Sequence, residues 1–572
     1  MRDSMKHGGP DDEGVYVDEK YPLALGHRRL SFLDLSPAGH QPMQDNDGKL
    51  QLIFNGEIYN FLELKAELKG AGHTFKNSSD TEVILKAYLQ WGTTCFEKFN
   101  GMFALALYDQ RSSQLILARD HAGIKPLYYS ITNDSLYFAS EVRAFKTINP
   151  QWPENEAWKI HLLTFGHLPE PVTTLRNVQP LKKGTYICIQ LPSLIVSHHT
   201  FCEFKFESII ADTATAVALV KEKLEKAVER HLISDAPIGL FLSGGTDSSL
   251  LTLLAHKTLK TNLHTLSIVF EDKKYSEEEY QKIIIDKTGA NHQSYLVTEE
   301  EFNSSIPDIL LAMDQPSTDG INSYFICKYA KAFGLKAVLS GLGADELFGG
   351  YDSFYRTSKV KYLNLLPSIV LSGAEAFGND KIKKLAFLKS NNFLGDYLLN
   401  RGFYSSSQTA EILGCSREEV DHAIASIDLP QVANIKSAID KVSAGEQHLY
   451  MQNQLLKDTD YMSMWHGVEV RVPFLDKDLM QAVHSISSAV KYDPSLKKSL
   501  LIKAFKDVLP KEIYERKKQG FTFPFATWLK TVSLSMEGLK AKSLQKKFFA
   551  DRLNWSRYWA LCLLQKAMYK PR

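Results

Sequence analysis

The sequence has no excess of charge of either sign and no long apolar run. Its 572 residues include 67 lysines and arginines against 66 aspartates and glutamates, a formal net charge of +1 at pH 7. Without a positive field over the whole chain, nucleic acids and membrane surfaces are not the expected partners. No stretch approaches the roughly 18 to 20 apolar residues that cross a bilayer, and the N-terminus is polar where a signal peptide is apolar. These absences predict a cytoplasmic enzyme or binding protein.

Cysteine is also scarce, and the chain has no internal repeat or low-complexity tract. The six cysteines form no CxxC pair and no metal-ligand spacing with neighbouring histidines. They are Cys95, Cys188, Cys202, Cys327, Cys415 and Cys562. We expect buried, reduced thiols.

The pattern of the chain changes between residues 190 and 210. Short alternating runs such as "QLIFNGEIYNF" and "QLILARD" fill the first part and predict a β-rich domain with few helices. Longer helical patterns such as "AVALVKEKLEKAVERHLI" then alternate with short apolar runs such as "PIGLFLSGG" and "KAVLSGLG". This alternation predicts a doubly wound, mostly parallel sheet. At this length two or three domains are expected.

The run "FLSGGTDSSLLTLLAHKTL" indicates a phosphate-binding loop. An apolar strand ends at Leu242, two glycines allow close approach of the backbone, and Ser248 and Ser249 begin an amphipathic helix. Free N–H groups at such a helix N-terminus attract an anion, and Asp247 would suit a Mg²⁺ that is also held by phosphate oxygens. The alternative is an ordinary strand–turn–helix connection with a serine cap.

A second loop, "VLSGLGADELFGGY", follows the same pattern. An apolar strand runs to Leu339, then come Ser340 and Gly341, and then Asp345. Ligands of open α/β sheets bind outside the carboxyl ends of the strands, so the two loops are expected to face one crevice. Asp247 and Asp345 could then share one metal ion.

Several long motifs together resemble the asparagine synthetases of the glutamine-hydrolysing type. In the synthetase part these are "SGGTDSS", "SGLGADELFGGY", "LLKDTDYMSMWHGVEVRVPFLD" and "RKKQGFTFP", and in the N-terminal part "LGHRRLSFLDLS", "NGEIYN", "SDTEVILKAY", "GMFALALYD" and "ARDHAGIKPLYY". The resemblance runs from about residue 5 to about residue 530. It implies an α/β protein with an N-terminal β-rich class II glutamine amidotransferase (Ntn-type αββα) domain at 1–192, a linker at 193–210 and a doubly wound ATP-pyrophosphatase-type synthetase domain at 211–572.

By this resemblance the synthetase domain uses ATP and Mg²⁺ to adenylate aspartate, and ammonia then attacks the acyl-adenylate to leave asparagine and AMP. Asp247 and Asp345 would hold the metal and, with Lys518, form the catalytic set. Read locally, Lys518 is a solvated lysine beside two other basic residues. The implied ATP-binding residues are Leu242, Ser243, Gly244, Gly245, Asp247, Ser248, Ser249, Ile268, Ser340 and Gly341.

The resemblance also implies a glutamine site in the N-terminal domain. Arg29 would bind the α-carboxylate, Asn55 with Gly56 would form the oxyanion hole, Asp80 would bind the α-amino group, and Glu57 would help to position the substrate. On local grounds Asn-Gly between apolar residues is more simply a hairpin turn, a reading compatible with an oxyanion role.

The chain departs from the family in two important places. The family nucleophile, a cysteine at the start of a "MCGI" sequence, is absent, and the opening "MKHGGPDDEG" aligns with a family segment that lies downstream of that start. A truncated enzyme and a genuine ammonia-dependent form both explain this, and the retained glutamine-binding residues favour truncation. The second departure is Leu342, where asparagine synthetases often carry glutamate.

The leading hypothesis is therefore an asparagine-forming ligase with small-molecule substrates: ATP, aspartate, and glutamine or ammonia. The alternatives are an amidotransferase acting on another carboxylate, such as a sugar acid or a β-lactam precursor, and an inactive regulatory homologue. A salt-bridge network is an equally good explanation for Asp458, Asp460, Glu469 and Arg471 in the long C-terminal motif. The sequence leaves the oligomeric state open, with a homodimer as one form.

Overall fold

Two halves with different sheets make up the computed structural model, which describes residues 1–132, 134–516, 523–532 and 538–568. The first half is dominated by an antiparallel six-stranded sheet with strand order β11-β10-β6-β5-β4-β3. Its strands are β3 (Met43–Gln44), β4 (Leu50–Ile58), β5 (Gly101–Asp109), β6 (Gln114–Arg119), β10 (Thr185–Gln190) and β11 (Ile195–Thr200). Every residue of β5 is buried, which explains the continuous apolar run "GMFALALY".

Layers cover both faces of this sheet. Helices α1 (Phe61–Gly70), α2 (Asp80–Trp91) and α3 (Cys95–Lys98) pack on the face that contains Leu105. Ala104 and Ala106 point to the opposite face because side chains alternate along a strand. That face packs on residues of the hairpin β1 (Asp12–Val17) and β2 (Ala24–Arg29) and of a small sheet of β7 (Tyr128–Ile131), β8 (Leu136–Ala139) and β9 (Gln179–Pro180). These are α, β and β layers of the expected αββα domain.

The boundary between the halves differs in detail from the expected linker at 193–210. Strand β11 lies inside that segment and pairs with β10 along its whole length, so the antiparallel sheet continues to Thr200. Helix α4 (Ala157–Phe165) belongs to the first half by sequence, yet it packs on α15 (Ser406–Leu413), α16 (Arg417–Ala425) and α26 (Trp555–Met568) of the second half. The two halves therefore share apolar contacts as well as a connection.

The second half is built on a parallel five-stranded sheet with strand order β14-β13-β12-β15-β16, as the alternating pattern predicted. The strands are β12 (Ile238–Phe241), β13 (His264–Val269), β14 (Asn291–Leu296), β15 (Ala337–Leu339) and β16 (Glu469–Arg471). The chain starts at β12, adds β13 and β14 on one side, and resumes with β15 on the other. Loops that leave β12 and β15 consequently diverge, and this is the position where open α/β sheets bind ligands.

Helices pack around this sheet and extend away from it. Those around the sheet are α5 (Thr213–His231), α6 (Thr246–Leu259), α7 (Glu278–Thr288), α8 (Glu299–Ala312), α9 (Ile321–Ala332), α10 (Ala344–Phe348), α19 (Lys457–Trp465), α20 (Lys477–Ser485), α21 (Ser488–Lys491), α22 (Ser499–Phe505), α23 (Lys511–Tyr514) and α24 (Phe525–Trp528). A peripheral group contains α11 (Thr357–Leu363), α12 (Ser368–Phe377), α13 (Asp380–Lys383), α14 (Phe393–Arg401), α15 (Ser406–Leu413), α16 (Arg417–Ala425), α17 (Pro430–Ala433), α18 (Ala438–Gly445), α25 (Leu539–Phe549) and α26 (Trp555–Met568). Among the described residues, none of these helices is long and apolar enough to cross a membrane.

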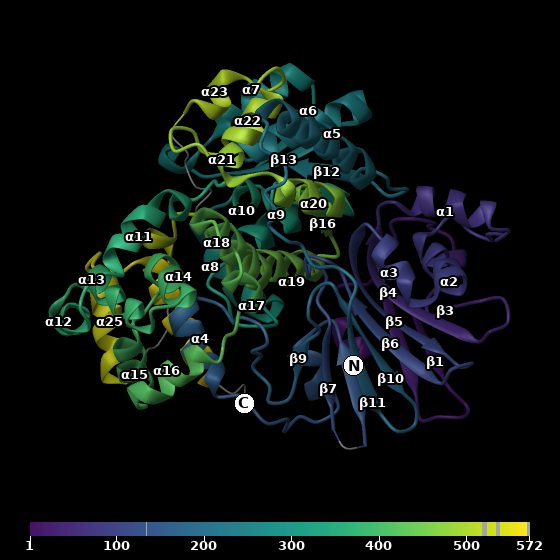
Figure 1. Cartoon of the computed structure of the whole chain (residues 1–572), viewed down its shortest axis with the longest axis horizontal. Coiled ribbons are helices and arrows are strands. Elements are labelled where there is room, and N and C mark those ends of the chain that lie inside the picture. The colour runs from purple at the N-terminus through teal and green to yellow at the C-terminus, as the bar shows by residue number, and fades with distance from the viewer. Residues whose placement is uncertain (133, 517–522, 533–537, 569–572) are drawn as a thin grey trace.

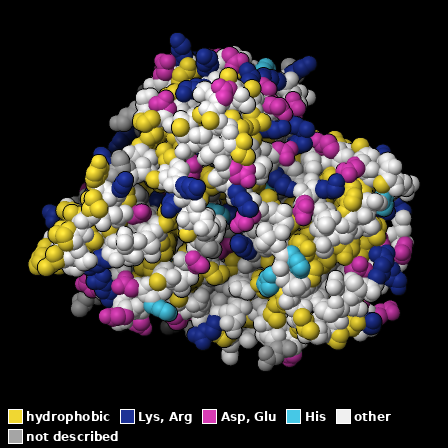
Figure 2. Space-filling model, viewed as in Figure 1, with side chains coloured by type: hydrophobic (Ala, Val, Ile, Leu, Met, Phe, Trp, Pro, Cys, Tyr) yellow, Lys and Arg dark blue, Asp and Glu magenta, His cyan; other side chains and the backbone are white. Residues whose placement is uncertain are grey.

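Apolar side chains gather on the outer edge of the peripheral group, at the left of Figure 2 where α12 lies in Figure 1. The largest exposed ones are Phe377, Ile369 and Leu365, which are 93%, 81% and 77% exposed. Exposed apolar patches of this kind often mark contact surfaces.

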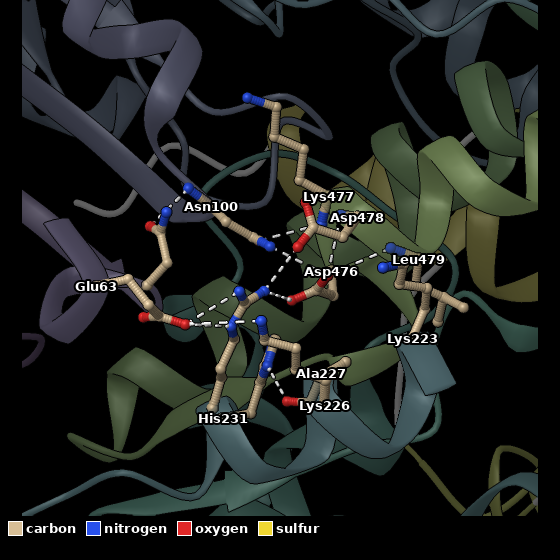
Figure 3. Close-up of polar contacts among 12 residues, drawn as sticks. Glu63, Asn100, Lys223, Lys226, Ala227, His231, Asp476, Lys477, Asp478 and Leu479 are labelled. Atoms are coloured by element: carbon tan, nitrogen blue, oxygen red, sulfur yellow. Dashed lines mark hydrogen bonds and ion pairs between the residues drawn. The ribbon is translucent and has the colours of Figure 1, made fainter. Parts of the chain in front are cut away.

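Polar contacts fasten the two halves together beside α5. The side chain of Asn100 donates to Asp476 Oδ1 over 3.1 Å and accepts from the backbone N–H of Lys477 over 3.1 Å (Figure 3). In the same region Arg230 lies between Glu63 of α1, at 3.1 Å, and Asp478 of α20, at 2.8 Å. These hydrogen bonds and ion pairs connect side chains of one half to the other and so fix how the two halves are oriented here.

A second, fully buried network joins the halves at β16. Arg471 is 0% exposed, and its guanidinium lies 3.0 Å from Glu469 Oε1 and 3.4 Å from Glu57 Oε2 of the first half. It also donates to the backbone carbonyls of His231 and Ile233 over 2.9 and 2.7 Å. Burial opposes its charge, but the carboxylates of Glu57 and Glu469 raise the pKa of Arg471.

Lys125 extends this network through the first half. Its ammonium group lies 3.2 Å from Asp460 and 3.5 Å from Glu469. Asp460, Glu469 and Arg471 of the long C-terminal motif thus belong to one salt-bridge network. Asp458 does not.

We predict that Arg471→Met destabilises the protein by about 3 to 5 kcal/mol, because it leaves buried carboxylates and carbonyls without their partner. Thermal and denaturant unfolding would measure the loss. The matched control is Lys221→Ala, which removes a partly exposed ion pair with Asp507 and should cost no more than about 1 kcal/mol. Equal effects of the two variants would show that the buried network does not stabilise the fold.

Candidate functional site

A cavity of about 1290 Å³ opens where the loops after β12 and β15 diverge. Most of the residues predicted for ATP line it: Leu242, Ser243, Gly245, Asp247, Ser248, Ile268, Ser340 and Gly341. Asp345 lines the same cavity. The other two predicted residues, Gly244 and Ser249, do not line the cavity. Ser249 is buried, and the carbonyl of Gly244 accepts from Arg516 over 3.0 Å. The two loops predicted to face one crevice do so.

The first loop is held by its own hydroxyl groups. Ser248 Oγ accepts from the backbone N–H of Ser243 over 3.2 Å and donates to the carbonyl of Gly245 over 3.2 Å. Gly244 has φ +82°, a left-handed conformation that favours glycine. Gly245 is the N-cap of α6 and has no side chain to occupy the first N–H groups of the helix. This argues against the simple serine-capped connection and leaves the helix N-terminus for an anion.

The second loop approaches the first very closely, and glycine makes this approach possible. A Cβ atom on Gly341 would lie 2.8 Å from Cβ of Asp247, and one on Gly350 would lie 1.6 Å from Oδ1 of Asp345. The backbone N–H of Ser340 donates to the carbonyl of Arg471 over 2.9 Å. Glycine and the sheet edge together bring the two aspartates to one point.

That point is occupied by a lysine that the sequence reasoning missed. Lys498 Nζ lies 2.7 and 2.5 Å from the two carboxylate oxygens of Asp247 and 2.5 Å from Oδ1 of Asp345. The lysine is buried; burial opposes its charge, but the two carboxylates raise the pKa of Lys498. In the sequence it follows another lysine in "SLKKSLL" and carries no local sign of this role. The predicted Lys518 lies outside the described residues.

The donor chemistry at this point fits Mg²⁺. The carboxylates of Asp247 and Asp345 both contact the ammonium group of Lys498. Magnesium is likewise usually held by one or two carboxylates together with substrate phosphates. Across the described part of the chain, no group of three or more His, Cys, Asp and Glu residues is arranged to hold a metal ion by itself. Phosphate oxygens would therefore have to supply the remaining ligands.

The cavity continues past Leu342 toward an aromatic and charged end. Arg401 lies 4.4 Å from the ring of Tyr351 and 3.9 Å from the ring of Tyr450, and it forms an ion pair of 2.9 Å with Glu446. Glu446 and Tyr450 belong to η9 (Glu446–Leu456), a π-helix of a kind that often occurs at functional sites. This end lies in the same cavity as Asp247 and Asp345.

Glu346 at this end titrates near neutral pH. Burial, and then the charge of Asp345, raise the pKa of Glu346 to about 7. Tyr351 donates to its carboxylate over 2.6 Å. The site therefore contains a carboxyl group that is partly protonated under physiological conditions.

A second, small cavity of about 50 Å³ brings together all five residues predicted to bind glutamine: Arg29, Asn55, Gly56, Glu57 and Asp80. Arg29 donates to the backbone carbonyls of Leu33 and Asp34 over 3.1 and 2.7 Å. Met464 and Glu469 complete the cavity from the second half of the chain. The sequence reasoning did not anticipate that contribution.

The local hairpin reading of Asn55 and Gly56 is wrong. Both residues lie inside β4 and pair with Ala104 and Phe103 of β5. Gly56 has φ +143°, and a Cβ atom on it would lie 1.9 Å from the carbonyl oxygen of Met102. The Asn-Gly pair thus marks a close approach of two strands rather than a turn.

Burial shifts the pKa values of two acids that line this small cavity. It raises the pKa of Asp80 to about 6, against the opposing hydrogen bond of 2.9 Å from the N–H of Ile58. It also raises the pKa of Glu57 well above its ordinary value, although Arg471 opposes this. An ionised Asp80 is therefore available above about pH 6.

None of the six cysteines lines this small cavity. Burial raises the pKa of each thiol: Cys95, Cys188, Cys202, Cys327, Cys415 and Cys562. A thiol must ionise to act as a nucleophile, and an activated cysteine has a lowered pKa. Cys95, Cys327 and Cys562 are buried as expected, Cys188, Cys202 and Cys415 are half-buried, and none of the six has the lowered pKa of an activated cysteine.

In the comparison with known proteins, two family models match separate parts of the chain. A family model described as asparagine synthase matches residues 219–562, and one described as a glutamine amidotransferase domain matches residues 1–200. Asparagine synthetase [glutamine-hydrolyzing] 1 of Bacillus subtilis is 32% identical over 93% of this chain and 84% of its own length. Asparagine synthetase [glutamine-hydrolyzing] 3 of the same organism is 28% identical over 96% and 88%, and amidase chry2 of Gibberella zeae is 27% identical over 92% and 84%. The chain belongs to the asparagine synthase family of carbon–nitrogen ligases.

Proposed function

We propose that this chain amidates aspartate to asparagine at the expense of ATP, through a β-aspartyl-AMP intermediate. The observation that carries the proposal is the convergence of Asp247, Asp345 and Lys498 beside the open N-terminus of α6 in one large cavity. Two acids, a buried cation and free helix N–H groups are the set that a transferring phosphate requires. Intact Asp247 and Asp345 argue against an inactive regulatory homologue.

In the first step an oxygen of the aspartate side chain attacks the α-phosphorus of ATP. The bond from this phosphorus to the bridging oxygen of the β-phosphate breaks, and pyrophosphate leaves. Ser243 to Ser249 would cradle the pyrophosphate, and Lys498 would stabilise the negative charge that develops on it. Mg²⁺, which Asp247 and Asp345 would hold, neutralises phosphate charge when it is bound.

In the second step the nitrogen of ammonia attacks the acyl carbon. The carbon–oxygen bond to the AMP phosphate breaks, AMP leaves, and the nitrogen loses a proton. In a form that carries a nucleophilic cysteine, glutamine would supply the ammonia from the small cavity, with Arg29 and Asp80 binding the ends of the amino acid and Asn55 and Gly56 stabilising the oxyanion. The chain described here would use ammonia directly.

A second candidate is the amidation of another carboxylate. Leu342 lines the cavity where many asparagine synthetases carry glutamate, so the acceptor contacts of this chain differ from theirs. A comparison of aspartate with sugar acids and β-lactam precursors as acceptors separates the two candidates.

Incubation with ATP, Mg²⁺, aspartate and ammonium is expected to yield AMP, pyrophosphate and asparagine. Asp247→Asn should lower pyrophosphate release by about 10²-fold or more, because a carboxylate that places the metal is lost. An unchanged circular dichroism spectrum would show that the variant folds. Pyrophosphate release at the wild-type rate in Asp247→Asn would refute its assignment, and AMP formation only with some other acid would favour the second candidate.

Lys498→Met should lower the rate of AMP formation by about 10² to 10³-fold, because the cation that faces the developing phosphate charge is gone. The matched control is Lys503→Met on α22, a lysine that is 43% exposed and does not line the cavity. The control should keep the wild-type rate. If both variants behave alike, Lys498 has no special role.

The chain should form asparagine from ammonium salts but release no glutamate from glutamine, because each of its six thiols has a raised pKa and none lines the small cavity. Its ammonia use should rise with pH as the fraction of NH₃ increases. Parallel assays of asparagine and glutamate measure both activities. Steady glutamate release at a rate near that of ammonium-driven synthesis would mean that another residue is the nucleophile.

A further inference from the structure

Two aspartates in the large cavity have no role in the steps above. Asp319 lies just before α9, and Asp458 is the second residue of α19. Both line the cavity that contains Asp247, Asp345 and Lys498. They come from segments 139 residues apart, calculated as 458 − 319, so only the fold brings them together.

Asp458 is buried without full compensation. It is 2% exposed, and its Oδ2 accepts a hydrogen bond of 2.5 Å from Ser317 Oγ. Its Oδ1 is buried and has no hydrogen-bond partner among the described residues. A buried carboxylate oxygen without a partner costs considerable free energy, so its retention at a cavity wall points to a ligand.

Asp319 adds a second negative charge at the same place. Its backbone N–H donates to Ser317 Oγ over 3.4 Å, so one hydroxyl group contacts both residues. A Cβ atom on the intervening Gly320 would lie only 3.0 Å from Cβ of Asp458. Burial first, and the charge of Asp319 second, raise the pKa of Asp458 well above its ordinary value.

The neighbouring cations are engaged elsewhere. Arg401 forms its ion pair with Glu446, and Lys457 donates to the backbone carbonyl of Leu168 over 3.1 Å. Within the described part of the chain, neither Asp319 nor Asp458 forms an ion pair of 4.0 Å or less. The two carboxyl groups thus face no cation among the described residues, and a cation from outside would favour their ionised forms and complete the pocket.

We propose that Asp319 and Asp458 bind the protonated amino group of the acceptor. This inference rests on the proposed function and deepens it: the acceptor is an amino acid, and an acid without an amine is rejected. An ammonium group brings one positive charge and three N–H donors, which match the unpartnered oxygen of Asp458 and the second carboxylate. A carboxylate of the same molecule would face Lys498 in the shared cavity. Sugar acids and other amine-free carboxylates lack the group that this pocket requires.

The test compares each amino acid with its amine-free analogue. Aspartate is measured against succinate, and glutamate against glutarate, as acceptors for AMP formation with ATP and ammonium at saturation. The wild-type chain should prefer the amino acid by about 10²-fold or more in kcat/KM, because the analogue leaves buried carboxylates unpaired. Asp458→Asn and Asp319→Asn should each raise the KM for the amino acid about tenfold or more and leave the KM for ATP unchanged.

The matched control is Asp352→Asn. Asp352 lines the same cavity but lies 2.6 Å from Lys497 and is largely exposed. Its variant should keep the wild-type preference for amino acids. Asparagine at position 458 has the shape of aspartate and can still accept from Ser317, so the melting temperature of Asp458→Asn should not fall. A lower melting temperature with unchanged acceptor KM would show a structural role and overturn the proposal.

Two further outcomes overturn it. The first is a wild-type chain that uses succinate as well as aspartate, which would leave the ligase reaction intact. The second is an unchanged preference for the amino acid in Asp458→Asn. If the wild-type chain forms AMP with no acid at all, the proposed function fails, and calorimetric titration of aspartate into the chain decides about the pocket: binding that Asp458→Asn abolishes supports it, and binding that persists in Asp458→Asn, or no binding to the wild type, refutes it.

Discussion

The buried guanidinium of Arg471 is the contact on which the arrangement of the two sites depends. Its side chain joins Glu57 of the small cavity to Glu469 of β16, and it also donates to two backbone carbonyls at the C-terminal end of α5. Its own carbonyl accepts the N–H of Ser340 at the start of the second loop. One residue therefore contacts a wall of the small cavity, the sheet edge and the loop after β15. Such a charge tolerates burial because two carboxylates and two backbone carbonyls surround it.

Sheet topology then decides where chemistry can occur. The chain leaves β12 and β15 in opposite directions, and the gap between the two loops becomes the cavity. Glycines at 341 and 350 remove the Cβ atoms that would keep the aspartates and the lysine apart. The same glycines therefore allow the two loops to approach closely and the charged side chains to meet.

Some charged side chains of the large cavity form ion pairs with other described residues, and others do not. Lys498 is shared by two aspartates, and Arg401 is balanced by Glu446 between two tyrosine rings. No cation among the described residues forms an ion pair with Asp319 or Asp458. In a region of low dielectric this imbalance favours a ligand that carries both a negative and a positive group, as an amino acid does.

Local patterns in the sequence determined the fold class, the two sheets and the two glycine-rich loops that line the large cavity. Helix α5 and strands β12, β13 and β15 lie where periodicity predicted them, and the glycine-rich runs after β12 and β15 form the expected loops. These features depend on residues close together in the chain, where alternation and turn chemistry carry enough information. The five predicted glutamine residues also meet in one cavity.

Tertiary structure alone decided which distant side chains meet. Lys498 is 251 residues from Asp247, and nothing around "SLKKSLL" reveals their contact. Asn55 and Gly56 looked like a turn because the partner strand β5, which makes the glycine necessary, lies more than forty residues away. The sequence likewise could not separate Asp458 from Asp460 and Glu469. Only burial showed that two of these acids are paired with Lys125 while Asp458 faces the cavity, since the energy of a buried charge depends on neighbours that the local pattern does not contain.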